Sequence, residues 1–407
     1  MHICMISNQY PPYFRGGDAI ACRRLSEALV KEGYKISVIF DPYSYKLITK
    51  SKEDCHIRNY IQNGVEIHPL YSGPLNFGYS YSGLQKENKR LTKLLHTLNP
   101  DLIHFHNFSA FGWGALRSAK EIGKPILLTL HDYWIACPRR KLTFNECNDN
   151  CISCQIKDKK PPSIKRQDYL KYVNAVICVS KNMVIDLKKK YPNLKYFIIP
   201  NGIDENMFYH ANQTELKEYQ TKYLLNDHFV LLFIGILQKQ KGIYELIKTI
   251  KLLESGIKTI LIGEDKISLD SIIKENNLES SILYLGKLED GSKQLSMAYQ
   301  VSNCFVLPSY MENCPYSLIE AMCFGLPIIS SNIGGIPEMI TNNGILIKPG
   351  NIKELRQAID KLYKNPILQD TFSRESRARF LTNYTLDENI KKHISLFNQF
   401  HSNGVDN

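Results

Sequence analysis

The sequence predicts an α/β protein built from two doubly wound, Rossmann-like domains, and three observations support this fold class. Short apolar runs typical of buried parallel strands alternate with helical patterns along most of the chain. The pattern restarts after the Pro-Asn-Gly-Ile-Asp run at 200–204, where a polar stretch separates two blocks. The 407 residues exceed the size of one compact core and fit two domains of ordinary size.

The first block, residues 1–200, opens with a strand over 2–7 and a loop that carries Gly16 and Gly17. A helix is then expected over 19–33, and strands at 35–40, 102–106, 126–129 and 175–179. The second block, 201–380, predicts strands at 229–234, 259–262, 282–285, 304–307 and 327–329, with helices over 243–253 and 315–324. A tail helix at about 381–402 is expected to pack back on the first domain.

Composition indicates a globular protein, with 43% apolar and 22% charged residues. The N-terminus has no basic leader, and no apolar run approaches the roughly 20 residues that cross a bilayer. The sequence therefore predicts a cytoplasmic protein.

Charge is unevenly distributed between the two blocks. Residues 1–200 hold 30 Lys and Arg against 16 Asp and Glu, whereas the rest hold 21 against 24. The basic excess concentrates in 157–195, where it could meet a phosphorylated acceptor or the anionic inner face of a membrane, or form a solvated face without a partner. Nucleic acid is not expected as a partner, because no zinc-finger, aromatic-platform or helix-turn-helix pattern accompanies the charge.

The densest motif follows the strand at 304–307. Glu312 lies in the loop after this strand, Pro315 starts the next helix, and Glu320 lies eight residues beyond Glu312. Backbone amides at a helix start suit a diphosphate, and two carboxylates so placed can reach different hydroxyl groups of one elongated ligand. A tight turn at Gly334-Gly335 allows close backbone approach. An ordinary strand–helix unit with capping acids is the plainer explanation for either Glu alone, but not for the whole run.

Three runs resemble glycosyltransferase family 4: the E-x7-E of Glu312 and Glu320, Ala321-Met322 followed by Gly-Leu-Pro-Ile-Ile, and Gly-Gly-Ile-Pro-Glu at 334–338. Pro-Asn-Gly-Ile-Asp at 200–204, Lys241-Gly242 and Gly16-Gly17 agree with it. The resemblance implies the GT-B fold, in which two domains face a cleft. It also implies a retaining hexosyltransferase-type enzyme that uses a UDP or GDP sugar, a glycan or lipid-linked acceptor and no divalent metal, with a role in surface polysaccharide, lipopolysaccharide or capsule assembly.

The resemblance also implies residue roles. Glu320 would bind the donor ribose, Glu312 would contact the transferred sugar, and Lys241 would balance the diphosphate charge. Residues 1–200 would bind the acceptor and 201–380 the donor. The remaining donor-binding candidates are the first-loop glycines and the start of the motif helix: Gly16, Gly17, Asn313, Cys314, Pro315, Tyr316 and Ser317.

One position departs from the family pattern, which places an Arg where this chain has Ile236. Lys241 would then act alone with the helix dipole, or Lys239 or Arg15 would substitute. A catalytically impaired partner subunit that binds nucleotide sugars is the alternative that this departure keeps open.

His131 follows the strand at 126–129 and resembles the acceptor-side histidine of the family, which would be catalytic. His104 and His106 alternate along a strand and so share one face. Together with Asn107 they could line the acceptor pocket, and a structural role is an equal alternative.

Four cysteines, Cys137, Cys147, Cys151 and Cys154, lie within 18 residues of a polar loop. In a reducing compartment this spacing suggests a structural zinc site, with an iron–sulfur site or metal-free thiols as alternatives. Thiols in apolar runs are expected as core residues, among them Cys4, Cys178, Cys304 and Cys323.

Overall fold

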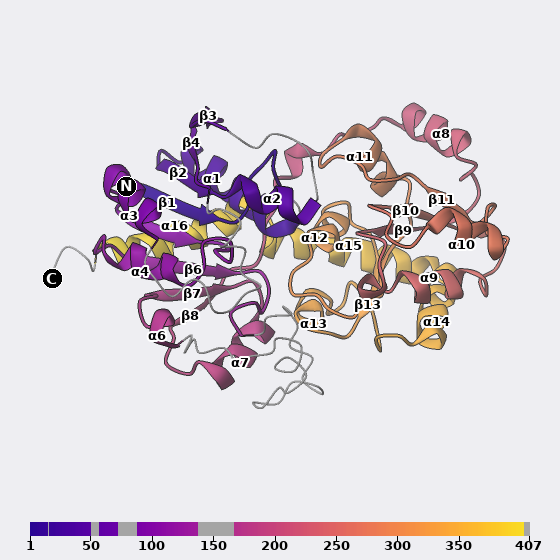
Figure 1. The fold of residues 1–407 in the computed structure, drawn as a ribbon. Coiled ribbons are helices and arrows are strands. Elements are labelled where there is room, and N and C mark those ends of the chain that lie inside the picture. The colour runs from indigo at the N-terminus through magenta and orange to yellow at the C-terminus, as the bar shows by residue number, and fades with distance from the viewer. Residues whose placement is uncertain (15, 50–56, 72–87, 137–166, 403–407) are drawn as a thin grey trace. The chain divides into compact units, whose positions relative to one another are not determined.

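The computed structural model describes residues 1–14, 16–49, 57–71, 88–136 and 167–402. The chain divides into two compact units, one of Met1–Pro200 with Asn389–Asn407 and one of Asn201–Glu388 (Figure 1). No helix in these ranges is long and apolar enough to cross a membrane.

Unit 1 is built on an eight-stranded sheet in the order β3-β4-β2-β1-β5-β6-β7-β8. Every neighbouring pair is parallel except β3 and β4, a short edge hairpin that the sequence pattern did not reveal. The strand β1 lies between β2 and β5, so the strand order reverses beside it. The strands are β1 His2–Ser7, β2 Lys35–Phe40, β3 Tyr60–Gln62, β4 Val65–Pro69, β5 Leu102–Phe105, β6 Ile126–Leu130, β7 Ala175–Cys178 and β8 Tyr196–Ile198.

The unit 1 helices are α1 Gly17–Lys31, α2 Pro42–Thr49, α3 Lys89–Leu98, α4 Gly114–Lys120, α6 Gln167–Leu170, α7 Lys181–Lys190 and, from the tail, α16 Leu386–Ser402. The tail helix contributes Phe397 to the core, where its ring lies 5.5 Å from that of His104. It begins at Leu386, later than the sequence predicts, because Ile203 pairs with the backbone on both sides of Thr385 and interrupts the helical pattern.

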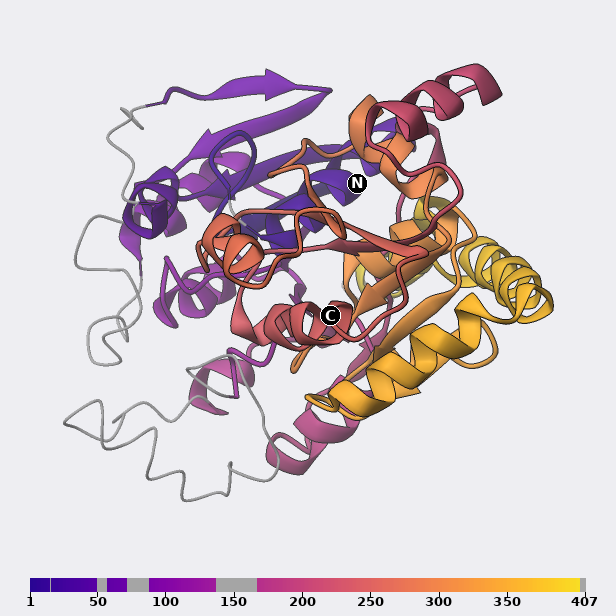
Figure 2. The same ribbon diagram turned by 90° about the vertical axis from the view of Figure 1, so that its right-hand side faces the viewer.

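Unit 2 is built on a six-stranded sheet in the order β11-β10-β9-β12-β13-β14, and all its neighbouring strands are parallel. Helix α14 packs beside α9, and α15 beside α12 (Figure 2). The strands are β9 Phe229–Ile234, β10 Ile257–Ile262, β11 Ile282–Tyr284, β12 Cys304–Leu307, β13 Ile328–Ser331 and β14 Gly344–Ile347. The helices are α8 Gln213–Lys222, α9 Ile243–Ile250, α10 Leu269–Glu275, α11 Lys293–Gln300, α12 Tyr316–Cys323, α13 Ile336–Met339, α14 Ile352–Tyr363 and α15 Pro366–Asn383, with the short 3-10 turns η2 Glu205–Met207 and η3 Lys239–Lys241.

The central strand β9 shows why this sheet forms. Its sequence, Phe-Val-Leu-Leu-Phe-Ile, is apolar throughout, and five of its six residues are buried, as expected for a parallel strand covered on both faces. It pairs with β10 on one side and β12 on the other, so the strand order reverses between β9 and β12. Loops that follow the carboxyl ends of strands at such a reversal form the usual ligand crevice of doubly wound sheets.

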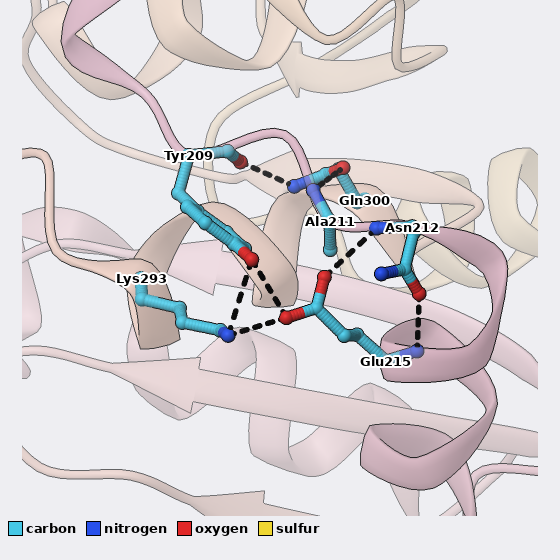
Figure 3. Close-up of polar contacts among 6 residues, drawn as sticks. All are labelled: Tyr209, Ala211, Asn212, Glu215, Lys293 and Gln300. Carbon is cyan, nitrogen blue, oxygen red and sulfur yellow. Dashed lines mark hydrogen bonds and ion pairs between the residues drawn. The ribbon is translucent and has the colours of Figure 1, made fainter.

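A polar cluster joins α8 to α11 (Figure 3). The ammonium of Lys293 and the hydroxyl of Tyr209 both donate to Glu215 Oε1, at 2.5 and 2.6 Å. These hydrogen bonds, with that of Lys293 the stronger, lower the pKa of the Glu215 carboxyl to about 2. Gln300 donates to the carbonyl of Tyr209 at 2.8 Å. The first residue of α11 is therefore bonded to α8, and its last residue is bonded to the segment just before α8.

Candidate functional site

The central feature of unit 2 is an ion pair between the loops after β9 and β12. Lys241 Nζ lies 2.5 Å from Glu312 Oε1, which also accepts a hydrogen bond from Ser309 Oγ at 3.0 Å. The side chain of Glu312 is only 9% exposed and that of Lys241 is 26% exposed. Partial burial strengthens the attraction between the two charges compared with a fully solvated pair. The sequence-predicted Lys241 and Glu312 are thus brought together at the strand reversal.

Close backbone packing fixes the position of Lys241. The next residue, Gly242, has φ +72°, and a Cβ built on it would lie 2.0 Å from the carbonyl oxygen of Pro308. The amide of Tyr310 donates to the carbonyl of Gln240 at 2.9 Å. Only glycine permits both this conformation and this approach. The loop after β9 is therefore held directly against the loop after β12.

The turn after β13 supports Glu312 from a third loop. Gly334 has φ +49°, and a Cβ there would lie 2.0 Å from the carbonyl oxygen of Glu312. The amide of Gly335 donates to the same oxygen at 3.2 Å. Loops that follow three adjacent strands, β9, β12 and β13, consequently meet around Glu312.

Helix α12 begins next to Glu312. Pro315 is its N-cap residue with ψ 132°, just outside the first turn in which the sequence places it, and Tyr316 and Ser317 open the helix. The first amides of a helix lack partners within the helix and carry partial positive charge. Cys314 is buried, and burial raises the pKa of its thiol to about 12. Its carbonyl accepts a hydrogen bond from Asn201 Nδ2 at 2.8 Å, a contact that the sequence did not reveal.

Glu320 lies on the buried side of α12 and is 6% exposed. The hydroxyl of Tyr299, from α11, donates to Glu320 Oε2 at 2.7 Å. The sequence pattern did not identify Tyr299, because a tyrosine on the buried side of an amphipathic helix looks like any other buried aromatic residue. Its one available signal is the spacing that places it on the buried side of α11, just before β12.

Lys241 is the cation that pairs with Glu312 in the part of the chain that the structure describes. Ile236, at the position where the family has Arg, is partly buried and cannot bind a phosphate by charge. Lys239 lies in η3 but is exposed. Within the ranges that the structure describes, the ion pair recorded for Glu312 is the one with Lys241. Arg15, the other proposed substitute, falls outside those ranges.

In unit 1, His131 follows β6 and stacks on His106, with ring centroids 5.7 Å apart and an interplanar angle of 13°. His106 and His104 are fully or almost fully buried, and His104 Nε2 lies 2.7 Å from Thr129 Oγ1. Burial lowers the pKa of all three imidazoles, and for His131 the nearby Asp18 carboxylate opposes that shift. Neutral, buried His104 and His106 are part of the packed sheet core.

The first loop of unit 1 carries the predicted glycines. Gly16 is the N-cap of α1 with φ +111°, and Gly17 is the first residue of the helix; both are exposed. Asn107 Nδ2 donates to Asp18 Oδ2 at 3.1 Å, which links the loop after β5 to the first turn of α1. The loops after β1 and β5 thus meet at the strand reversal of unit 1, as the corresponding loops do in unit 2.

The four-cysteine segment and the lysine-rich run at 157–166 lie outside the described residues. Within the described ranges, no group of three or more His, Cys, Asp or Glu side chains is arranged to hold a metal ion. Cys4, Cys178, Cys304 and Cys323 are buried, as expected of core thiols.

Comparison with known sequences assigns a family match to each unit. Residues 15–206 match the family described as Glycosyltransferase Family 4, and residues 216–379 match the family described as Glycosyl transferases group 1. A relative in Bacillus subtilis, named as the putative teichuronic acid biosynthesis glycosyltransferase TuaC, is 24% identical over 388 residues, covering 91% of this chain and 93% of its own.

Solved structures show the same fold. A sucrose-phosphate synthase from Thermosynechococcus elongatus superposes with a TM-score of 0.76 at 19% identity, covering 98% of this chain and 99% of its own. Anabaena HepE, solved in complex with UDP, superposes with a TM-score of 0.74 at 16% identity, covering 98% and 100%.

Proposed function

The chain belongs to glycosyltransferase family 4 and has the GT-B fold, and from this we propose that it moves a sugar from a nucleotide-diphosphate sugar to an acceptor hydroxyl with retention of anomeric configuration. The single observation that supports this most strongly is the Lys241–Glu312 pair at the strand reversal of unit 2. A cation and a carboxylate at that position match the two ends of a sugar diphosphate, one anionic and one rich in hydroxyl groups.

We assign Glu320 to the donor ribose, Glu312 to hydroxyl groups of the transferred sugar, and Lys241 with the start of α12 to the diphosphate. Lys241 bonded to Glu312 is poised to contact a phosphate oxygen once a donor brings negative charge beside it. The amides that open α12, at Tyr316 and Ser317, add the positive end of a helix dipole. Asn313, Cys314 and Pro315 would shape the loop around the phosphates. Gly16 and Gly17, in the first loop of unit 1, stay predicted donor-binding residues.

The proposed reaction needs no nucleophile from the protein. The bond between the anomeric carbon and the diphosphate oxygen breaks, and a bond to the acceptor oxygen forms on the same face. The acceptor proton passes to the departing phosphate oxygen. Lys241 would stabilise the charge that develops on the leaving diphosphate, which is where electrostatic stabilisation accelerates such a step. His131 would orient the acceptor hydroxyl or the donor sugar. We propose no divalent metal for this step.

The relatives guide the choice of substrates. HepE was solved with UDP, so UDP sugars are the first candidates and GDP sugars the second. TuaC is named for teichuronic acid biosynthesis, which supports a glycan or lipid-linked acceptor in the assembly of a surface polysaccharide. The exposed side of α7 carries Ile185, Lys188 and Lys189. Apolar and basic side chains together favour an anionic membrane surface, so we place the enzyme at the inner face of the membrane.

A thermal-shift screen of UDP and GDP sugars tests the donor assignment. A ligand at 100 times its dissociation constant stabilises a protein by about 2.7 kcal/mol, which raises the melting temperature measurably. We expect one nucleotide class to do so, and the anomeric proton of the product, observed by NMR, to match that of the donor. Inversion at the anomeric carbon contradicts the mechanism. Binding without turnover on any acceptor supports instead an impaired partner subunit, which the isoleucine at 236 would explain.

A further inference from the structure

Tyr299 connects two helices of unit 2 through one hydrogen bond at the proposed ribose site. Its hydroxyl lies 2.7 Å from Glu320 Oε2 and 3.4 Å from the carbonyl oxygen of Ser317. Tyr299 and Glu320 are 21 positions apart, on α11 and α12, and both are buried. A buried hydroxyl that donates to a carboxylate makes a charge-assisted bond, which is shorter and stronger than one between neutral groups.

The ring of Tyr299 is held on several sides. It stacks on Phe324, the residue that caps α12, with centroids 4.9 Å apart and an interplanar angle of 8°. Phe208 contacts Tyr299 and Phe324 edge-on, with centroids 6.3 and 4.9 Å away. The hydroxyl therefore has little freedom to move away from Glu320. Burial, followed by the charge of Glu320, raises the pKa of Tyr299 well above its usual value, so the hydroxyl keeps its proton and remains a donor.

We propose that Tyr299 is a positioning residue for the donor nucleotide, which holds the Glu320 carboxylate in the orientation that accepts hydrogen bonds from the ribose hydroxyls. This inference rests on the proposed function and extends it to a residue outside the E-x7-E motif. A carboxylate has about four lone-pair directions, and the bond from Tyr299 occupies one of them on Oε2, which restricts the orientation of the group. An unfixed carboxylate on a helix can rotate about its side-chain torsions, and part of the binding free energy is then spent on ordering it.

The position of α11 reinforces this role. Lys293, its first residue, is bonded to Glu215 on α8, and Gln300, its last residue, is bonded to the carbonyl of Tyr209 just before α8 (Figure 3). Because Tyr299 precedes Gln300, the bond from Gln300 to the Tyr209 carbonyl anchors the turn that carries the tyrosine. The carboxylate on α12 is thus oriented from a helix that is itself fixed at both ends.

The test compares UDP with 2′,3′-dideoxy-UDP, which lacks both ribose hydroxyls, by calorimetric titration; GDP and its dideoxy analogue form a second pair. Wild-type protein is expected to prefer the ribonucleotide. Tyr299→Phe keeps the ring and removes the hydroxyl, so we expect about tenfold weaker UDP binding, nearly unchanged dideoxy-UDP binding, and a raised donor KM with little change in kcat. Tyr219→Phe is the matched control, since Tyr219 is a buried tyrosine of the same unit whose hydroxyl has no hydrogen-bond partner within the described residues.

Each outcome supports or overturns the positioning role of Tyr299. A purely structural role for Tyr299 predicts equal loss for both nucleotides, and unchanged discrimination in Tyr299→Phe overturns the inference while leaving the proposed function intact. If neither UDP nor GDP binds wild-type protein, the proposed function fails and the inference fails with it. Because each ratio compares two ligands on one sample, partial unfolding of a variant does not alter it. In a Glu320→Gln background, the further change Tyr299→Phe should leave discrimination the same; an additive loss contradicts action through Glu320.

Discussion

Lys241 and Glu312 are 71 positions apart in the chain, yet the ammonium of one lies 2.5 Å from the carboxylate of the other. The contact is a consequence of strand order, because β9 and β12 are neighbours in the sheet although two strands separate them in sequence. Gly242 makes the contact possible by letting its backbone approach Pro308. The paired charges occupy the place where a doubly wound sheet binds its ligand.

Lys241→Met should lower kcat by about 10²- to 10³-fold, the usual cost of removing one group that stabilises developing negative charge. The donor KM should change less, because the charge on the leaving oxygen grows mainly in the transition state. Steady-state release of nucleoside diphosphate measures both constants. Lys248→Met, which removes an exposed lysine on α9 of the same unit, is the control and should leave kcat unchanged. Equal losses in the two variants would count against a specific role for Lys241.

Gly242→Ala should destabilise unit 2 more than Gly286→Ala does. Both glycines have almost the same φ, +72° and +71°, but an added Cβ meets Pro308 only at Gly242 and has open space at Gly286. The backbone strain alone costs about 1–2 kcal/mol, and the clash at Gly242 adds to it. Urea unfolding monitored by circular dichroism measures the difference. Equal destabilisation would show that the close approach of the two loops is absent in solution.

The loops of the donor site could be predicted from the sequence, since Glu312, Glu320 and Lys241 each follow or begin a recognisable element. The pairing of Lys241 with Glu312 could not, because it depends on which strands become neighbours. The role of Tyr299 could not be predicted for the same reason. Its partner lies on another helix, and in the sequence Tyr299 is one apolar-side aromatic residue among several.

The sequence pattern also missed β3, β4, β8 and β14. These strands are short and most of their residues are not buried, so their apolar alternation is weak. For His104 and His106 the sequence pattern was clear, but it allowed two interpretations. Their alternation along a strand was visible, but alternation does not distinguish a ligand pocket from a packed core, and both side chains are buried.

Acid should destabilise unit 1 through its buried histidines. Burial lowers the pKa of His393 to about 4 and lowers those of His104 and His106 well below their usual value. Between about pH 6.5 and pH 4 the unfolded chain therefore binds protons that the folded chain does not, so stability falls as pH falls. His393→Leu should reduce the loss between pH 6.5 and 5 by about 1.5 kcal/mol, because the full slope of 1.36 kcal/mol per pH unit applies only once the unfolded histidine is protonated.

Urea unfolding of wild-type and variant protein at the two pH values measures this change. His96→Leu, at an exposed position on α3 of the same unit, is the control and should keep the pH dependence of wild type. An unchanged dependence in His393→Leu would contradict a neutral, buried His393.

The four-cysteine segment predicts about one zinc ion per chain in protein purified without chelators. In structural sites of this type, four cysteine thiolates bind one Zn²⁺ ion. Elemental analysis should find zinc in the wild type and lose it in Cys151→Ser/Cys154→Ser. The core thiol variant Cys304→Ser should keep its metal content, although burying a hydroxyl there will reduce stability. Iron in place of zinc would favour the cluster alternative, and no metal would leave four thiols without a shared role.

The central claim is that the Lys241–Glu312 site holds a nucleotide-sugar donor, and single-turnover release of nucleoside diphosphate from the donor sugar tests it most directly. Glu312→Ala should lower the rate at least 100-fold, because the transferred sugar loses a carboxylate contact at the reacting centre. Glu275→Ala, an exposed position on α10 of the same unit, should match the wild type. A Glu312→Ala variant that binds and turns over the donor as the wild type does would contradict the assignment.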